Sequence, residues 1–116
     1  MRYILLANPQ NAVVAAMTEH EQRAITERYI AFTKALAESG ALLAGEQLQP
    51  ADTATTVRVR DGEVLLADGP FAELPEVFGG FWMVEAPDLD TVLKYAQDCP
   101  AAELGSVEVR ALVDRG

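Results

Sequence analysis

The sequence predicts an α+β fold: a ferredoxin-like βαββαβ sheet with an inserted hairpin and with both helices on one face. Two amphipathic helix patterns, each placed between strand patterns, indicate this class. A two-residue turn signal between two further strand patterns indicates the hairpin. The chain has 116 residues, and we expect residues 1–116 to form one domain.

The first half of the chain begins with a short apolar run. Tyr3 to Ala7 predicts a buried strand that ends at Asn8-Pro9, and residues 8–17 are expected to form a loop. Thr18-Glu-His-Glu21 has the spacing of a capping box and predicts the start of a helix. Apolar residues then recur every three or four positions, at Ile25, Tyr29, Phe32 and Leu36. Ser39-Gly40 ends this helix, because glycine adopts the left-handed conformation there.

Residues 41–44 predict a second strand, and Gly45 and Pro50 in the segment that leaves it indicate a loop or an edge and not a central strand. Thr53 to Arg60 alternates valine with arginine, and Asp61-Gly62 is a strong turn signal that returns the chain through residues 63–66. Residues 73–78 are expected to form a short turn of helix, with Pro75 at an early helical position.

Gly80 to Ala86 predicts the next strand, and its two leading glycines indicate a bulge or a close backbone approach. Asp88 is expected to cap the second helix, which ends at Cys99-Pro100. Residues 106–113 predict the last strand, with Val107 and Val109 on an apolar face. Because helices cover only one face of such a sheet, we expect the other face, with Trp82 and Leu112 on it, to be covered by a second copy.

Composition excludes several functional classes. The formal net charge is −9, which disfavours direct binding to nucleic acid or to anionic lipid. No apolar run is long enough to span a membrane, and no targeting signal is visible, so we expect a cytoplasmic protein. The single cysteine, Cys99, is expected to be a small buried hydrophobe. No metal-ligand spacing, glycine-rich phosphate loop or catalytic triad is present, so no metal and no cofactor are expected.

Residues 68–82 contain the sharpest candidates for a site. Asp68-Gly-Pro-Phe-Ala-Glu73 combines residues that favour a turn with two carboxylates and one aromatic ring. Asp68 and Glu73 could act as an acid and base pair, or Asp68 could bond the backbone of its own turn and Glu73 could favour a helix start. Phe71 could be a core residue or a platform for a ligand.

The remaining candidates are spread along the chain. Trp82 could line a dimer interface or a ligand pocket. Arg58, Arg60 and Arg110 could pair with neighbouring glutamates or hold a substrate carboxylate. His20, the only histidine, is expected to be a solvated surface residue in the capping turn.

Several motifs resemble one known family. Asp68-Gly-Pro-Phe-Ala-Glu73, together with Ala54-Thr-Thr-Val-Arg58, Asp61-Gly62, Gly79-Gly80 and Gly105-Ser-Val-Glu-Val-Arg110, is similar to the DGPF branch of the YCII-related family. The resemblance implies a small dimeric α/β barrel of ferredoxin-like topology. It also implies an association with extracytoplasmic-function sigma factors. In the YciI-like branch a histidine on the first helix is paired with an aspartate, whereas this chain has Tyr29 near that place and Asp52 only loosely in register, so the dyad is incomplete.

Two functions follow from the sequence. The first is a homodimer that binds a small organic molecule near Asp68, Phe71, Glu73, Tyr29, Trp82 and Arg110. Any reaction there would be lyase- or isomerase-like proton transfer by Asp68 and Glu73. The alternative is a regulatory or interaction module that contacts a sigma factor through its acidic surface.

Overall fold

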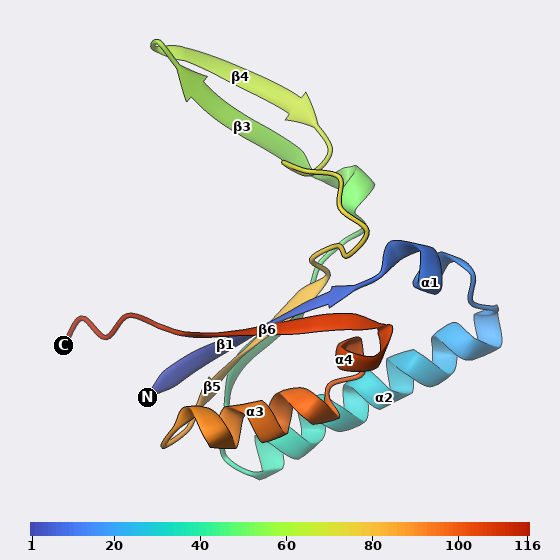
Figure 1. Cartoon of the computed structure of the whole chain (residues 1–116), viewed down its shortest axis with the longest axis vertical. Coiled ribbons are helices and arrows are strands. Elements are labelled where there is room, and N and C mark those ends of the chain that lie inside the picture. The colour runs from blue at the N-terminus through green and yellow to red at the C-terminus, as the bar shows by residue number, and fades with distance from the viewer.

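The element order confirms the βαββαβ arrangement with an inserted hairpin. The computed structural model describes residues 1–116 (Figure 1). The strands are β1 (Arg2–Pro9), β2 (Leu42–Gln47), β3 (Thr55–Arg60), β4 (Glu63–Asp68), β5 (Gly80–Glu85) and β6 (Gly105–Ala111), and the helices are α1 (Asn11–Ala15), α2 (Glu19–Glu38), α3 (Leu89–Asp98) and α4 (Ala101–Leu104). The main sheet has the order β2-β5-β1-β6 with antiparallel neighbours, and β3 and β4 form a separate two-stranded sheet.

One face of the main sheet forms the core together with the helices. Tyr3, Leu5 and Ala7 of β1 are buried on this face, and the register places Tyr3 opposite Val84 and Leu5 opposite Trp82 of β5. Both long helices lie on the same side of the strands (Figure 1). The buried core contains Tyr3, Leu5, Ala7, Phe32, Leu36, Ala41, Trp82, Val84, Ala86, Val92, Ala96, Cys99 and Ala101. None of the helices combines the length and the hydropathy needed to cross a bilayer.

Local signals set the ends of the helices as expected. The Thr18 hydroxyl accepts from the Glu21 backbone N–H at 3.1 Å, and the Glu21 carboxylate accepts from the Thr18 N–H at 3.2 Å, which completes the capping box. Gly40 adopts a φ of +83° after the helix. Asp88 caps α3, because its carboxylate accepts the Thr91 N–H at 2.9 Å. These bonds satisfy backbone groups that a helix end leaves unpaired.

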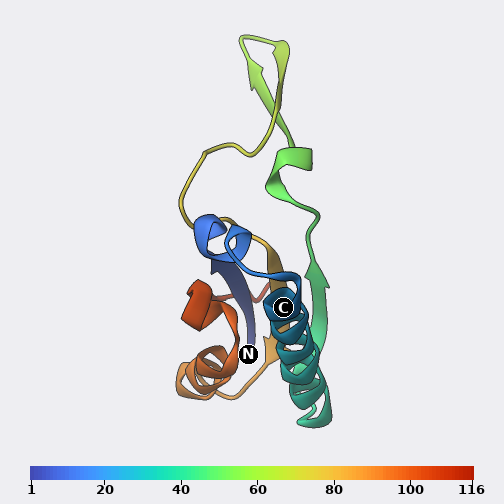
Figure 2. The same ribbon diagram turned by 90° about the vertical axis from the view of Figure 1, so that its right-hand side faces the viewer.

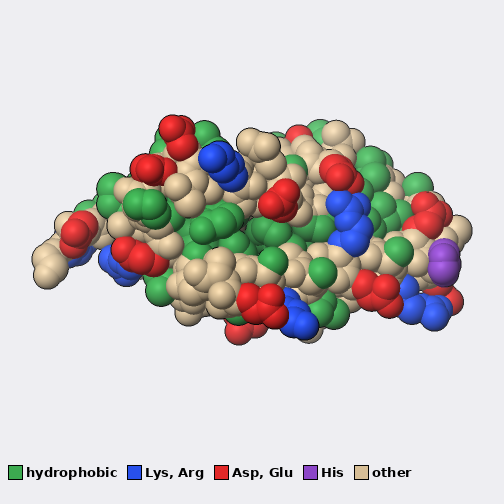
Figure 3. All heavy atoms as spheres, turned by 90° about the horizontal axis from the view of Figure 1, so that it is seen from below, with side chains coloured by type: hydrophobic (Ala, Val, Ile, Leu, Met, Phe, Trp, Pro, Cys, Tyr) green, Lys and Arg blue, Asp and Glu red, His purple; other side chains and the backbone are tan.

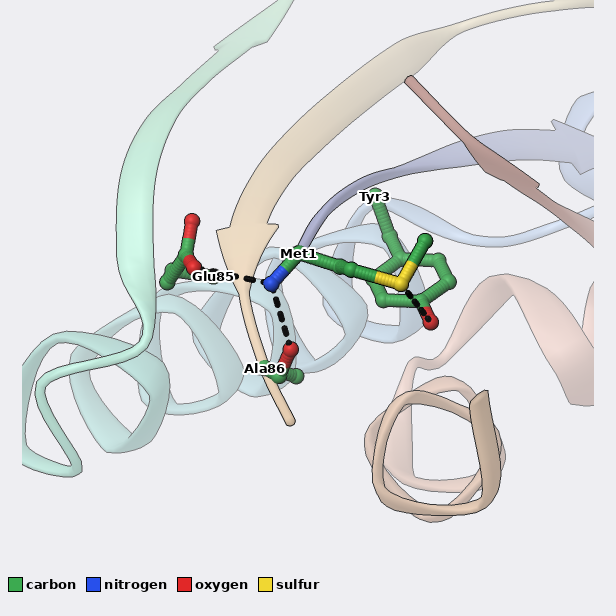
Figure 4. Close-up of polar contacts among 4 residues, drawn as sticks. All are labelled: Met1, Tyr3, Glu85 and Ala86. Carbon is green, nitrogen blue, oxygen red and sulfur yellow. Dashed lines mark hydrogen bonds and ion pairs between the residues drawn. The ribbon is translucent and has the colours of Figure 1, made fainter. Parts of the chain in front are cut away.

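The start of β1 is anchored to the end of β5. The Met1 amino group donates to Glu85 Oε1 at 2.9 Å and to the Ala86 carbonyl at 3.0 Å (Figure 4). The Tyr3 hydroxyl contacts the Met1 sulfur at 3.7 Å in the same view. These contacts hold the two central strands together at the end of the sheet opposite to the hairpin.

The hairpin leaves the opposite end of the sheet. Figures 1 and 2 show β3 and β4 projecting away from the helices and from the other strands. Asp61 and Gly62 have φ values of +52° and +78°, the backbone that the predicted two-residue turn requires. We call residues 54–74 the arm; it contains this hairpin and the Asp68-Gly-Pro-Phe-Ala-Glu73 motif.

The structure corrects several boundaries. β1 continues through Pro9 and α1 follows it, where a loop was expected. Residues 73–78 form no helix, because the Asn11 N–H bonds Pro75 O and the Val77 N–H bonds Pro9 O, which ties the segment to the end of β1. The pairing register between β2 and β5 shifts between Leu42 and Ala44, so the bulge lies in β2. Gly80 of β5 provides the close backbone approach, to Glu46.

The last part of the chain also differs from expectation. A short helix, α4, follows Pro100, and β6 ends at Ala111 and not at Val113. Trp82 was expected on the uncovered face of the sheet, but it points to the helices. Both faces of β5 are apolar, with Phe81 and Met83 alternating with Trp82 and Val84, so alternation alone could not decide which face is inside.

Candidate functional site

A groove lies between α2 and α3 on the helix side of the molecule. Its volume is about 420 Å³. The groove is lined by Arg28, Ala31, Phe32, Ala35, Leu36, Tyr95, Asp98 and Pro100. Figure 3 shows the helix side of the molecule, where hydrophobic side chains gather along the middle and charged side chains lie on both sides. Small residues at two positions of α2, Ala31 and Ala35, leave the space between the helices open.

An aromatic cluster lies beside this groove. Phe32, which lines the groove, meets the Trp82 ring edge to face with centroids 5.1 Å apart, and the Tyr29 ring stacks on Trp82 at 6.0 Å. The Trp82 indole N–H donates to the Thr33 hydroxyl at 2.9 Å, and that hydroxyl donates to the Tyr29 carbonyl at 2.9 Å. Such pairs favour fixed ring geometry. The contact with Trp82 therefore fixes the orientation of Phe32, the one ring of the cluster that lines the groove.

One end of the groove carries an exposed ion pair. Arg28 Nη1 lies 2.9 Å from Glu103 Oε2. The hydrogen bond to Arg28 lowers the pKa of the Glu103 carboxyl, and the same bond raises the pKa of Arg28. Because exposed pairs of this kind contribute little to stability, Arg28 can exchange Glu103 for another anionic partner at small cost.

Two ionisable side chains near the pair are held in their neutral forms. Burial raises the pKa of Tyr29 to about 12 and that of the Cys99 thiol to about 11. Cys99 is buried, as expected, and its raised pKa makes it a poor thiolate nucleophile. Tyr29 stays protonated at neutral pH and can act there as a hydrogen-bond donor.

The motif residues lie on the arm and not beside the groove. Asp68, Phe71 and Glu73 are all exposed, and Phe71 is 77% exposed, so it is not a core residue in the single chain. The Gly69 N–H bonds Ala54 O at 2.7 Å, and the Thr56 hydroxyl bonds Gly69 O at 2.8 Å. The backbone and Thr56 therefore shape this turn, and the Asp68 carboxylate takes no part in it.

Arg110 lies on the uncovered face of the sheet. Its register partner is Ile4, and its Nε lies 3.8 Å from Glu108 Oε2, which is the glutamate pairing expected for it. Tyr29 and Trp82 lie on the helix side of the same sheet. The six candidate residues therefore separate into three places: the helix side, the uncovered face and the arm. Their roles in binding stay predictions.

Some polar residues were missed by sequence reasoning. Arg28, Asp98 and Glu103 come together only because α4 and the end of α3 lie near α2, and no spacing in the chain signals this. On the uncovered face, Ser106 donates a short hydrogen bond to Glu76, close to Asn8 in the register. An isolated antiparallel backbone pairing of Glu76 with Gln10 holds Glu76 next to the end of β1, and its carboxylate there reaches Ser106.

No arrangement of metal ligands is present among the His, Cys, Asp and Glu side chains. His20 is exposed in the capping turn, as expected. The chemistry available in the groove is therefore that of Arg28, Tyr95 and Asp98: capture of an anion, hydrogen bonding and stacking.

Comparison with known proteins agrees with the fold. The chain is similar to an uncharacterised protein, R00369, from Rhizobium meliloti (strain 1021), with 33% identity over 114 residues, covering 97% of this chain and 92% of that protein. It is also similar in structure to 5-chloro-2-hydroxyhydroquinone dehydrochlorinase (TftG) from Burkholderia phenoliruptrix AC1100, in a complex with 2,5-dihydroxybenzoquinone. The TM-score is 0.54 at 12% identity, covering 97% of this chain and 94% of that chain. At this identity the likeness concerns the fold.

The family model for the YCII-related domain matches residues 1–115. The match covers the main sheet, both long helices and the arm. It agrees with the resemblance seen in the DGPF motif. The chain therefore belongs to the YCII-related family.

Proposed function

We propose that this protein binds a small organic molecule with a planar ring in the groove between α2 and α3. The observation that carries the proposal is the groove itself, about 420 Å³ in volume, with Phe32 and Tyr95 in its lining and Arg28 at one end. Ligand sites of this kind are concave, mostly apolar and supplied with a few polar groups, and they have volumes of roughly 300–1,000 Å³.

The charge at the groove end indicates the ligand class. Arg28 can form a bidentate contact with a carboxylate or a phenolate oxygen when it leaves Glu103. Tyr95, which lines the groove, has a hydroxyl that can donate a further hydrogen bond. A ring that carries an acidic oxygen matches these groups. The structural relative in complex with 2,5-dihydroxybenzoquinone offers a precedent on the same fold, as an analogy only.

Proton transfer by Asp68 and Glu73, the lyase- or isomerase-like reaction considered from the sequence, has no support in this groove, because both carboxylates lie on the arm. The function that we propose is binding, without an assigned reaction. We also propose that the protein acts as a cytoplasmic homodimer, since the sheet has one uncovered face.

The test is a binding measurement with 2,5-dihydroxybenzoquinone as the probe. Quenching of the fluorescence of Trp82, the single tryptophan, reports the binding. Ala35→Phe fills the groove and should abolish binding, whereas Ala37→Phe, an exposed change on the same helix outside the groove, should leave it unchanged. Arg28→Gln should weaken binding at least about tenfold, the loss expected for one charge-assisted contact. Equal affinity of the Ala35→Phe variant and the original chain would refute the groove as the site.

A second candidate function is the regulatory or interaction module, for which a sigma factor is the expected partner. The exposed apolar residues of the arm favour it, because exposed apolar patches mark interaction surfaces. Co-purification of the protein with an extracytoplasmic-function sigma factor, lost on Leu66→Lys, would support this function. Co-purification that is unchanged by Leu66→Lys would remove the arm as its basis.

A further inference from the structure

The groove between α2 and α3 has one charged end and is otherwise largely apolar. Arg28 of α2 and Asp98, the last residue of α3, are the charged residues of its lining. Figure 1 shows that α2 and α3 run in opposite directions, and the ion pair of Arg28 with Glu103 ties α4, which follows α3, to the middle of α2. Arg28 and Asp98 therefore lie at the same end. The rest of the lining is Ala31, Phe32, Ala35, Leu36, Tyr95 and Pro100.

Asp98 has no ionic partner within the chain. Arg28 pairs with Glu103 and not with Asp98, and Lys94, one turn earlier on α3, makes no ion pair with it. The place is also unfavourable for a carboxylate, because a helix C-terminus carries a partial negative charge and the last turn of α3 contains no basic side chain. A cation bound there would be attracted by the Asp98 carboxylate and by the end of the helix together.

A ligand with only a negative charge leaves this end of the groove poorly balanced. One guanidinium, that of Arg28, already lies among the two carboxylates of Glu103 and Asp98. A ligand carboxylate that takes Arg28 releases Glu103, so that both carboxylates are then unpaired. The net charge of the whole chain, −9, adds to the repulsion. A ligand that brings an amino group together with its carboxylate adds no net charge and gives Asp98 a partner.

We propose that the ligand of the groove is an aromatic amino acid. Its carboxylate binds Arg28, its ammonium group binds Asp98, and its ring lies against Phe32 and Tyr95. In an α-amino acid one carbon atom carries both charged groups and the ring follows on a short side chain. This shape matches a groove with both charges at one end and apolar residues beyond them. The inference rests on the proposed function, because it names the ligand class of the same groove.

The first experiment compares three probes with the same ring: L-phenylalanine, 3-phenylpropionate, which lacks the amino group, and 2-phenylethylamine, which lacks the carboxylate. Isothermal titration calorimetry should show L-phenylalanine binding about five- to tenfold more tightly than either of the others, the gain expected for one charge-assisted contact at a partly exposed place. L-Phenylalanine that binds no more tightly than 3-phenylpropionate would overturn the proposal.

The second experiment tests Asp98 as the residue that determines specificity. Asp98→Asn removes the charge and keeps the shape, so it should weaken L-phenylalanine about five- to tenfold and should not weaken 3-phenylpropionate. Asp90→Asn is the matched control, since Asp90 is an exposed aspartate of the same helix outside the groove, and it should leave both affinities unchanged. Equal losses of the two ligands in Asp98→Asn, or the same selective loss in Asp90→Asn, would contradict the role of Asp98.

The third experiment separates Asp98 from the other carboxylate. Glu103→Gln frees Arg28 from its ion pair, so L-phenylalanine and 3-phenylpropionate should both bind more tightly. A selective loss of L-phenylalanine in this variant would place the amino group at Glu103 and overturn the assignment.

The ligand class and the groove can fail separately. If 2,5-dihydroxybenzoquinone and 3-phenylpropionate bind and Ala35→Phe abolishes their binding, but L-phenylalanine is not preferred, only the amino acid is refuted. If none of the probes binds the original chain, the proposed function fails with it.

Discussion

The main sheet and the arm are built from the same kind of strand and end in opposite environments. In β1, Tyr3, Leu5 and Ala7 alternate with less buried residues and lie in the core. In β3, Val57 and Val59 alternate with arginines in the same way, yet both valines are exposed. The comparison teaches that alternation defines an apolar face but not what covers it. If the two regions behave as a packed domain and an uncovered arm, the same kind of substitution should have different effects in each.

The largest expected effect comes from Leu5→Ala, because Leu5 is fully buried. The change removes buried methyl groups and leaves a cavity, so the free energy of unfolding should fall by about 2–5 kcal/mol. Leu66→Ala, the same change on the exposed arm, should alter it by less than about 0.5 kcal/mol. Urea denaturation of dilute, monomeric protein measures both. Equal losses would show that the arm belongs to the core that folds cooperatively.

Alanine substitutions at two glycines, one in the main sheet and one in the arm, should both lower the stability, for different reasons. A Cβ at Gly105 would meet the Asn8 carbonyl oxygen and lie 2.8 Å from the Gln10 nitrogen, so Gly105→Ala should cost about 1–3 kcal/mol through overpacking. A Cβ at Gly62 meets nothing within 4 Å, but its φ is +78°, so Gly62→Ala should cost about 1–2 kcal/mol of left-handed strain, confined to the arm.

Hydrogen exchange should show where the protection of backbone amides falls: in the main sheet for Gly105→Ala, and in β3 and β4 for Gly62→Ala. Asparagine tolerates the left-handed conformation, so Gly62→Asn should recover most of the loss. Gly105→Ser should recover nothing, because its Cβ meets the same backbone atoms. Recovery at Gly105 would contradict the steric explanation.

Thr18→Ala should have a smaller effect on the packed domain. It removes the hydroxyl that accepts the Glu21 N–H, and such a loss costs about 1 kcal/mol. Thr26→Ala is the matched control on the same helix, since the Thr26 hydroxyl bonds only the carbonyl of Gln22 and alanine is the better helix former. Thermal denaturation should show a lower midpoint for Thr18→Ala alone; a similar drop for both variants would remove the capping box as the cause.

The smallest effect is a change of stability with pH. Burial raises the pKa of Tyr29 from 10.0 to about 12 and that of Cys99 from 9.0 to about 11. The unfolded chain loses these protons first, so stability is fully present below about pH 9 and declines as the pH rises to about 12. Tyr29→Phe should remove the part of this decline above pH 10. Tyrosinate absorbance and the urea midpoint across this range test it; an unchanged decline would place its origin elsewhere.

Much of the fold was predictable because its signals are local. Thr18 with Glu21, Gly40, and Asp61 with Gly62 act through backbone groups a few residues away, and all three appear as expected. Pro75 shows the limit of such reasoning. It permits an early helical position, but the segment bonds the end of β1, which lies far away in the chain.

The candidate site was predicted less well than the fold. Tyr29 and Trp82 do lie together, stacked on the helix side. Arg28 and Glu103 were not foreseen, because 75 positions separate them and only the path of α3 and α4 joins them. Phe71 shows a further limit: an aromatic residue in a shaped turn looks like a core residue, but nothing in the single chain comes to cover it.

The sequence by itself determined the order of the elements, the helix caps, the hairpin turn and the membership of the YCII-related family, because these depend on neighbouring residues and on motifs in order. Only the tertiary structure decided that Trp82 faces the helices, that α2 and α3 leave a groove, and that Val57 and Val59 of the hairpin stay exposed. The physical reason is that both faces of a strand can be apolar, and burial depends on which distant segments come to lie against each face.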